Sequence, residues 1–201
     1  GGPRTTKALV SKFQASETNS SGEPTAWKDK RAMIYTYGQT YEIANVAQFS
    51  EGYAVYKFSN KKSDGTNGND ETGEFVDTDL PMIRVAEMYL NYAEAALRGG
   101  GDVGLATQYI NKLRQRAYGN TSGNVSSINL DFVLDERARE LYWEGTRRTD
   151  LIRFNKFTEG YNWPFKGGVT NGTSVESFRR LFPIPFNAIT INPNLTQNTG
   201  Y

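Results

Sequence analysis

The residues best suited to chemistry lie in DERARELYWEGTRRTDLIRF, residues 135–154, where five acids and five arginines surround aromatic and aliphatic side chains. Such a stretch could supply paired carboxylates for acid–base catalysis, a basic face for nucleic acid, or a set of structural ion pairs. The spacing of the charges and the composition of the whole chain decide among these three interpretations.

The acids of this stretch are spaced for a helix. Glu136, Glu140 and Glu144 are four residues apart, so a helix places them on one face, and Arg148 continues the row. A glycosidase needs two carboxyls about 5 to 9.5 Å apart on opposite sides of the scissile bond, whereas one helix face offers a single wall. Glu144 and Arg148 also have the favourable order of an i,i+4 ion pair. The spacing therefore favours a structural ion-pair lattice over catalysis.

The composition of the chain excludes several classes of function. The chain has 23 Lys plus Arg and 22 Asp plus Glu, a net charge of +1, and so lacks the clustered cations of a nucleic-acid binder. It contains no Cys and no His, which removes disulfides, thiol nucleophiles, imidazole metal ligands and the Ser-His-Asp triad. The acids of the polar loop 60–74 do not have EF-hand spacing. We expect no nucleic-acid partner, no metal site and no cofactor.

Helices dominate the part of the chain that positions these charges. Residues 79–118 predict a helical hairpin, with Thr78 or Asp79 as N-cap, Pro81 in the first turn and a second helix over about 103–117. Residues 129–157 predict a helix over about 130–144, which places Trp143 in the core, and a short helix around 147–156. Small residues at the contact of the hairpin are typical of a tetratricopeptide-like unit.

The rest of the chain is irregular. Residues 1–78 show no sustained helical period, and the aromatic-rich stretches 31–43 and 52–59 predict short strands. Residues 158–201 predict extended loops and a tail, because proline, glycine and asparagine recur there. The expected fold class is mainly α: a tetratricopeptide-like hairpin plus further helices, with long irregular loops and a few short strands, in one region spanning 1–201.

Several stretches, taken in order along the chain, resemble the C-terminal region of the SusD/RagB family, the surface glycan-binding lipoproteins of Bacteroidetes. They begin near Asp29 with DKRAMIYTYGQTYEI and end at Tyr201. Between these ends lie TDLPMIRVAEMYLNYAEAALRGG, INKLRQRAYG, LDERARELYWEGTRRTDLIRF, NWPFKGG, LFPIP and NPNLTQNTGY.

The resemblance implies a non-enzymatic subunit on the extracellular face of the outer membrane. Its partners would be an oligosaccharide or polysaccharide, such as a starch-like glycan, and a SusC-like TonB-dependent transporter. Full members of the family are longer and carry a signal peptide, a lipidated cysteine and N-terminal helical repeats that this chain lacks. We therefore expect the missing N-terminal helical-repeat part of the same protein to be a further partner.

Aromatic side chains that could stack on sugar rings gather in two places. The first is a cluster around residues 27–41, and the second is Trp163 in its Gly/Pro loop. The glycan-binding candidates are Trp27, Tyr35, Tyr37, Tyr41, Arg31 (with Lys28 and Asp29 beside it) and Trp163. The alternative for Trp27 and the tyrosines is packing against the helices. For the whole chain, the alternatives to glycan binding are a protein-docking module that contacts the transporter and a glycoside hydrolase that uses only carboxylates.

Overall fold

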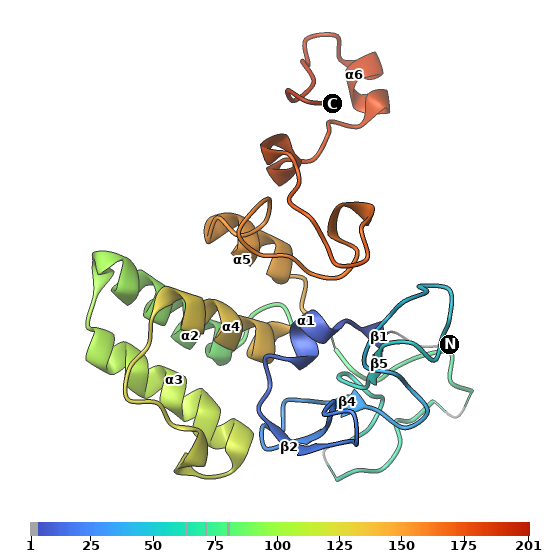
Figure 1. Cartoon of the computed structure of the whole chain (residues 1–201). Coiled ribbons are helices and arrows are strands. Elements are labelled where there is room, and N and C mark those ends of the chain that lie inside the picture. The colour runs from blue at the N-terminus through green and yellow to red at the C-terminus, as the bar shows by residue number, and fades with distance from the viewer. Residues whose placement is uncertain (1–3, 63, 71, 80) are drawn as a thin grey trace. The chain divides into compact units, whose positions relative to one another are not determined.

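The computed structural model describes residues 4–62, 64–70, 72–79 and 81–201, and the chain forms two compact units with a boundary between Arg147 and Arg148 (Figure 1). This boundary falls inside the predicted helical segment 129–157. Helices carry most of the regular structure and the strands are few and short, which confirms the predicted mainly α class. Among the described residues, none of the helices combines the length and apolar composition needed to cross a bilayer.

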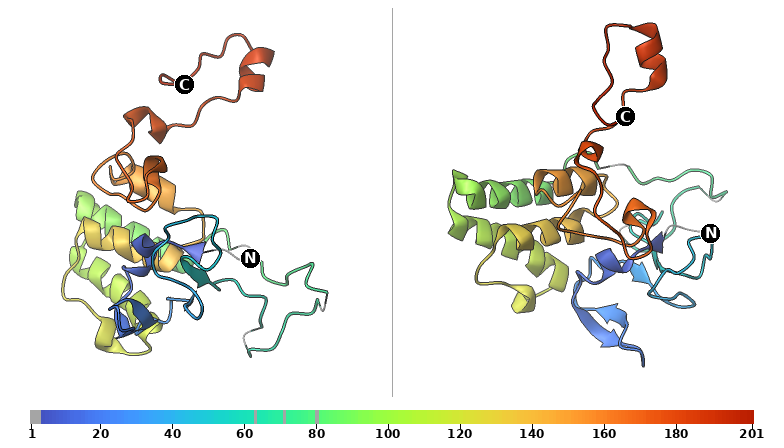
Figure 2. Two further views of the ribbon diagram at one scale, coloured as in Figure 1. Left: turned by 45° about the vertical axis from the view of Figure 1, so that its right-hand side comes forward. Right: turned by 45° about the horizontal axis from the view of Figure 1, so that its top comes forward.

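Three helices form the helical part of the first unit. They are α2 (Val85–Ala95), which continues through a π-helical turn at Ala96–Gly100, α3 (Val103–Tyr118) and α4 (Leu130–Leu141). Helix α2 packs against both α3 and α4, as the two turned views also show (Figure 2). The α2–α3 pair confirms the predicted helical hairpin.

Apolar spacing explains why these segments pack as helices. Helix α2 buries Ala86, Leu90 and Ala93, and α3 buries Ala106 and Ile110 among others, each at intervals of three or four residues. The small alanines let the helix backbones approach closely. Cap residues define both ends of α3. At its start, the Asp102 carboxylate accepts from the backbone N–H groups of Gly104 and Leu105, and at its end Gly119 (φ 75°) adopts the left-handed conformation.

Two predicted helix ends were wrong. Helix α2 begins at Val85, not near Asp79, and its N-cap is Arg84, whose side chain makes no cap hydrogen bond. The guanidinium of Arg84 instead reaches across to Glu140 on α4 and to Glu144 just beyond it. Helix α4 ends at Leu141, because Tyr142 is extended and Trp143 adopts a left-handed φ of 65°. Trp143 is consequently 42% exposed and does not lie in the core, contrary to prediction.

The N-terminal part of the first unit contains short strands around a second, smaller core. Strands β1 (Arg4–Thr5), β5 (Tyr53–Val55) and β4 (Ile34–Tyr35) form an antiparallel sheet in that order, and β2 (Ala15–Thr18) pairs with β3 (Pro24–Trp27). Helix α1 (Lys7–Val10) lies between β1 and β2 in the chain. The buried cluster here consists of Val10, Phe13, Ile34, Tyr53, Val55 and Tyr142.

The register of this sheet separates an inner from an outer face. Ile34 pairs with Val55, and both are buried, whereas Tyr35 pairs with Ala54. Since successive side chains of a strand point to opposite faces, Tyr35 lies on the outer face. The backbone N–H of Tyr56 donates to the carbonyl of Met33 (3.1 Å), which continues the pairing and places Met33 and Tyr56 on the outer face as well.

The second unit, from Arg148 onward, is mostly irregular. It contains most of α5 (Arg147–Arg153), the short helix α6 (Phe186–Ile191) and single turns at Lys166–Gly168 and Ser177–Arg180. Side chains hold its loops by bonding to the backbone. The Gln197 amide, for example, both accepts from the N–H of Ile184 and donates to its carbonyl, at 2.8 and 2.9 Å.

Candidate functional site

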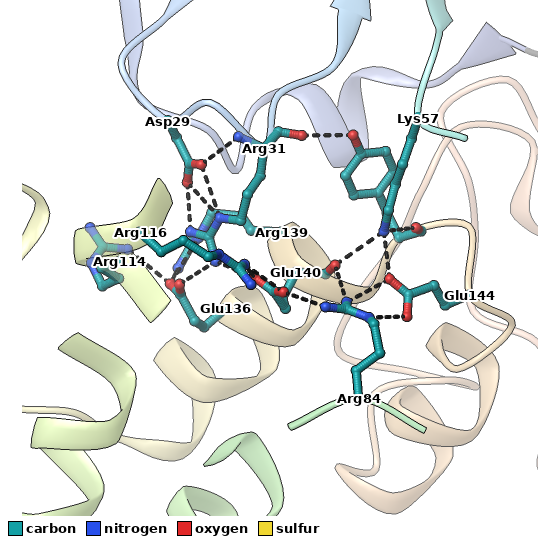
Figure 3. Close-up of polar contacts among 11 residues, drawn as sticks. Asp29, Arg31, Lys57, Arg84, Arg114, Arg116, Glu136, Arg139, Glu140 and Glu144 are labelled. Atoms are coloured by element: carbon teal, nitrogen blue, oxygen red, sulfur yellow. Dashed lines mark hydrogen bonds and ion pairs between the residues drawn. The ribbon is translucent and has the colours of Figure 1, made fainter. Parts of the chain in front are cut away.

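A buried network of charges joins the short-strand segment to the helices of the first unit (Figure 3). Its centre is Glu136 on α4, whose side chain is inaccessible to solvent. Glu136 Oε2 accepts from Arg114 Nη1 (2.8 Å) and Arg139 Nη2 (2.6 Å), and Oε1 lies 2.8 Å from Arg31 Nη1. The members of the buried network are Asp29, Arg31, Lys57, Arg84, Arg114, Glu136, Arg139, Glu140 and Glu144.

Glu140, one turn further along α4, is also surrounded by guanidinium groups. Its Oε1 accepts from Arg84 Nη1 (2.9 Å), its Oε2 accepts from Arg31 Nη1 (3.1 Å), and Arg116 Nη2 donates to both oxygens (2.7 and 2.6 Å). Burial by itself raises the pKa of this carboxyl. The hydrogen bonds from Arg116 and Arg84 and the charge of Arg31 outweigh that effect and lower the pKa to about 2.

Glu144 lies just beyond the end of α4 and pairs with residues distant in sequence. Its Oε1 accepts from Lys57 Nζ (2.6 Å) and Arg84 Nη2 (2.7 Å), and Oε2 accepts from Arg84 Nε (2.9 Å). Lys57 also donates to the carbonyls of Glu140 and Tyr142, at 3.1 and 2.7 Å. The three protons of its ammonium group are therefore all in use.

Of the predicted ion-pair lattice, Glu136, Glu140 and Glu144 belong to the network, but the helical row does not run on to Arg148. The reason is that α4 ends at Leu141, so the i,i+4 spacing of Glu144 and Arg148 no longer places them on one helix face. Arg148 belongs to the second unit, where Nη2 donates to the carbonyls of Arg179 (2.9 Å) and Arg180 (3.2 Å). Its guanidinium also lies 4.0 Å from the ring centroid of Phe182.

The structure corrects the assignment of Arg31 as a glycan-binding residue. Arg31 is 8% exposed, and Asp29, which is 1% exposed, accepts from its Nε (2.9 Å) and Nη2 (2.6 Å). The remaining Nη1 faces Glu136 and Glu140. Because every edge of the guanidinium already faces a carboxylate, Arg31 holds the 29–31 segment against α4 and has no edge for a sugar.

The network does not have the arrangement of an acid–base catalyst. A general acid at neutral pH needs a raised pKa, whereas the arginines lower the pKa values of Glu136, Glu140 and Glu144. Their side chains are also 0%, 2% and 8% exposed. Among the described residues, no group of three or more carboxylates is placed to hold a metal ion.

A hollow of about 410 Å³ opens beside the network. Its apolar wall contains Met33, Phe58, Pro81 and Tyr142, and its polar floor is formed by Arg84, Glu140 and Glu144. Lys30 and Arg116 also line it, and we call these two residues the rim. The backbone N–H of Lys30 donates to the carbonyl of Ala117 (2.9 Å), which fixes Lys30 beside the α3 turn that carries Arg116.

The predicted glycan-binding aromatics divide into packed and exposed residues. Trp27 and Tyr41 pack against the smaller core, with ring centroids 6.4 and 5.6 Å from that of Tyr53. Tyr35 and Tyr37 are 51% and 83% exposed. The expected cluster is thus split, because Trp27 and Tyr41 are the partly buried members and the other two tyrosines face solvent.

Trp163 lies in the second unit within an aromatic group of its own. Its ring centroid is 5.8 Å from that of Phe157 and 5.9 Å from that of Tyr161. The ammonium of Lys166 lies 4.9 Å from the Trp163 ring, a cation–π contact. These partners support the loop and leave Trp163 half-buried.

The sequence reasoning missed Tyr56 and Phe58. Tyr56 is 53% exposed and shares the outer sheet face with Tyr35 and with Met33, which also lines the hollow. Phe58 lines the hollow as well. The signal was present in residues 52–59, where aromatics alternate with small or aliphatic residues, but alternation does not tell which face is covered.

Comparisons with known proteins agree with the resemblance in the sequence. A sequence model of the SusD family matches residues 3–201. The starch-binding protein SusD of Bacteroides thetaiotaomicron is 43% identical over 178 residues, which cover 86% of this chain. The chain spans only 31% of the length of that relative.

Solved structures show the same likeness. Surface glycan-binding protein A from Bacteroides thetaiotaomicron matches with a TM-score of 0.50 and 31% identity, over 73% of this chain and 29% of that one. A SusD superfamily protein from Parabacteroides distasonis matches with a TM-score of 0.65 over 98% of this chain and 42% of that one. At its 23% identity, this second match indicates a shared fold.

Proposed function

The chain belongs to the SusD family, and on this premise we propose that it is part of a non-catalytic glycan-binding component of an outer-membrane uptake system of the SusC/SusD type. In the whole protein, a lipid anchor would hold it at the extracellular face of the outer membrane. It would pass oligosaccharides to a SusC-like TonB-dependent transporter. The relatives named as starch-binding and surface glycan-binding proteins support this assignment.

The observation that carries the proposal is the outer face of the β1–β5–β4 sheet. Tyr35 and Tyr56 are both about half exposed there, at diagonal positions on paired strands. Diagonal neighbours on a sheet are within reach of aromatic side chains, so two rings can present one apolar surface. An apolar ring face is the group that stacks on a pyranose, and paired strands hold such rings in a fixed orientation.

Titration calorimetry with a panel of oligosaccharides tests the proposal. We expect Tyr35→Ala and Tyr56→Ala each to weaken binding of the best ligand by about tenfold, which corresponds to about 1.4 kcal/mol. The melting temperature should stay unchanged, because both rings lie outside the core. Phe186→Ala is the matched control, since Phe186 is an aromatic 80% exposed in the second unit. Unchanged affinity in both tyrosine variants would refute a role of this face.

One observation favours protein docking as a second function. Met82 and Ile83, just before α2, and Val85, its first residue, are 87%, 78% and 66% exposed, and such apolar groups are frequent at protein interfaces. If none of the panel binds, whereas Met82→Asp or Ile83→Asp abolishes association with a SusC-like transporter, the docking role is the better assignment. Release of reducing ends from a glycan by the purified chain would instead favour the hydrolase.

A further inference from the structure

The two carboxylates that line the hollow have almost no unused acceptor sites. Each carboxylate oxygen of Glu140 accepts two hydrogen bonds from arginine, and Glu144 Oε1 accepts one from Lys57 and one from Arg84. A carboxylate offers about four lone-pair sites, so the Glu140 carboxylate is saturated. A ligand that donates hydrogen bonds therefore meets few free carboxylate acceptors in the hollow.

Two of the inner cations are equally occupied. Lys57 uses all three of its protons, as described above. Arg84 uses four of its five N–H groups, on Glu140 Oε1, the Glu140 carbonyl and both oxygens of Glu144. Both residues thus hold the wall of the hollow and leave hardly any donor for a ligand.

The rim differs from these inner cations. Toward the residues that the structure describes, Arg116 donates through Nη2 and not through Nε or Nη1, and its side chain is 54% exposed. The Lys30 ammonium makes no hydrogen bond or ion pair with any residue that the structure describes. Both residues line the hollow, and the backbone bond from Lys30 to Ala117 holds the Lys30 backbone beside the α3 turn that carries Arg116. Lys30 and Arg116 are therefore the two cationic residues of the hollow with hydrogen-bond donors that a ligand could use.

The hollow also has an apolar wall, and its volume suits one or two sugar rings. Met33, Phe58 and Pro81 form this wall, and about 410 Å³ falls in the range of about 300 to 1,000 Å³ that small-molecule sites occupy. Met33 also lies on the outer sheet face with Tyr35 and Tyr56. A glycan that stacks on those tyrosines can therefore continue into the hollow without leaving an apolar surface.

We propose that this hollow binds an acidic sugar residue, a uronate, with its ring against Met33, Phe58 and Pro81 and its carboxylate between Lys30 and Arg116. The inference rests on the proposed function and names the class of glycan. A uronate differs from a neutral hexose at C6, where a carboxylate replaces a hydroxymethyl group. The carboxylate has only acceptors, and these match the unused donors of the rim, whereas the C6 hydroxyl also brings a proton, for which the floor has few acceptors.

Calorimetric titration with two trisaccharides of equal length, trigalacturonic acid and maltotriose, tests the proposal. We expect the acidic trisaccharide to bind at least tenfold more tightly, and this preference should shrink when salt is raised, because the rim is exposed. Lys30→Gln should weaken binding of the acidic trisaccharide by about tenfold and leave maltotriose unchanged. Lys30→Glu should weaken it further, by about a hundredfold. Lys28→Gln, an exposed lysine two residues away that does not line the hollow, should change neither.

Each other outcome has a defined meaning. Equal affinity for the two trisaccharides, or an acidic preference that survives in Lys30→Glu, overturns the uronate site. If maltotriose alone binds, the proposed glycan function stands and the uronate site does not, whereas both fail if no sugar of any kind binds. Glutarate, a carboxylate without a sugar ring, is a further arm. If glutarate binds as tightly as trigalacturonic acid, the hollow recognises charge only and the sugar assignment is wrong.

Discussion

Glu136 and Lys30 lie in the same part of the first unit, and they differ in how completely their hydrogen-bonding capacity is used. Glu136 is inaccessible to solvent and faces three arginines, whereas Lys30 is exposed and its ammonium has no hydrogen-bond or ion-pair partner among the described residues. The buried network joins segments that are distant in sequence, such as 29–31 and α4. At the rim, Arg116 pairs with Glu140 through Nη2 alone, and the Lys30 ammonium pairs with none of the described residues. Charges that are buried and saturated act as structure, and only those left with unused donors can act on a ligand.

The largest effect should come from breaking the buried network at Arg31. Arg31→Ala leaves Asp29, Glu136 and Glu140 without a shared cation, and removing one partner of a buried ion pair costs about 3–5 kcal/mol. Urea unfolding measures this loss. Arg31→Lys, which keeps the charge but not the planar fork, should be intermediate and serves if the alanine variant does not fold. Lys28→Ala should stay within about 0.5 kcal/mol of the parent. An Arg31→Ala variant as stable as the parent contradicts the structural role.

The second largest loss of stability should come from acidification, which weakens the buried network. The pKa of Glu140 falls from 4.5 to about 2 on folding, so its contribution is present above pH 4.5 and is lost as the pH falls toward 2. That shift corresponds to about 3 kcal/mol, and the lowered pKa values of Glu136 and Glu144 act with the same sign. Urea midpoints measured between pH 6 and pH 2 should follow this loss.

Glu140→Gln isolates the share of Glu140 in this acid effect. The variant should be less stable at pH 6 and should lose less stability on acidification than the parent. Equal pH dependence in the two proteins would show that Glu140 titrates normally in the folded chain.

A smaller contribution to stability is expected from the ion pair between Lys57 and Glu144 at the edge of the network. Their side chains are 13% and 8% exposed, and the pair is supported by Arg84. A double-mutant cycle with Lys57→Met and Glu144→Gln should give a coupling energy of about 1–2 kcal/mol in urea unfolding. A coupling energy of zero would mean that the two charges are held independently of each other.

The smallest effect on stability should come from the rim. Lys30→Gln should change the free energy of unfolding by less than about 0.5 kcal/mol, because the ammonium has no partner among the described residues to lose. Urea unfolding of this variant beside Arg31→Ala sharpens the comparison, since the two residues are neighbours in sequence. A loss above 1 kcal/mol in Lys30→Gln would show that the rim, too, is structural.

Helices were the most predictable part of this fold. Ala106, Ile110, Leu113 and Ala117 recur at helical spacing, and α3 covers all of them. The start of α2 was not predictable from cap residues, because its N-cap, Arg84, makes no side-chain cap hydrogen bond and instead pairs with Glu140 and Glu144, which are distant in sequence. Strands β1, β4 and β5 have two or three residues each, too few for a periodic pattern, so their pairing depends on contacts between distant segments.

The candidate site was predictable in its residue types but not in its assignments. The rows of acids and arginines pointed to ion pairs, and the aromatics at 27–41 pointed to a sugar surface. Trp27 packs inward against Tyr53, however, while Tyr56, which the sequence did not single out, faces solvent on the outer face of the sheet. Burial of an aromatic depends on which face of its strand meets the core, and a strand of two or three residues does not reveal that face.

By itself, the sequence determined the mainly α class, the family, and a chemistry without histidine or cysteine. These follow from apolar spacing, ordered motifs and composition, which need no knowledge of distant contacts. The tertiary structure alone decided that Arg31 reaches Glu136 and Glu140 more than a hundred positions away and that adjacent Lys30 does not. The physical reason is that desolvation and hydrogen-bond saturation depend on what surrounds a charge in space, so two neighbouring cations can have opposite roles.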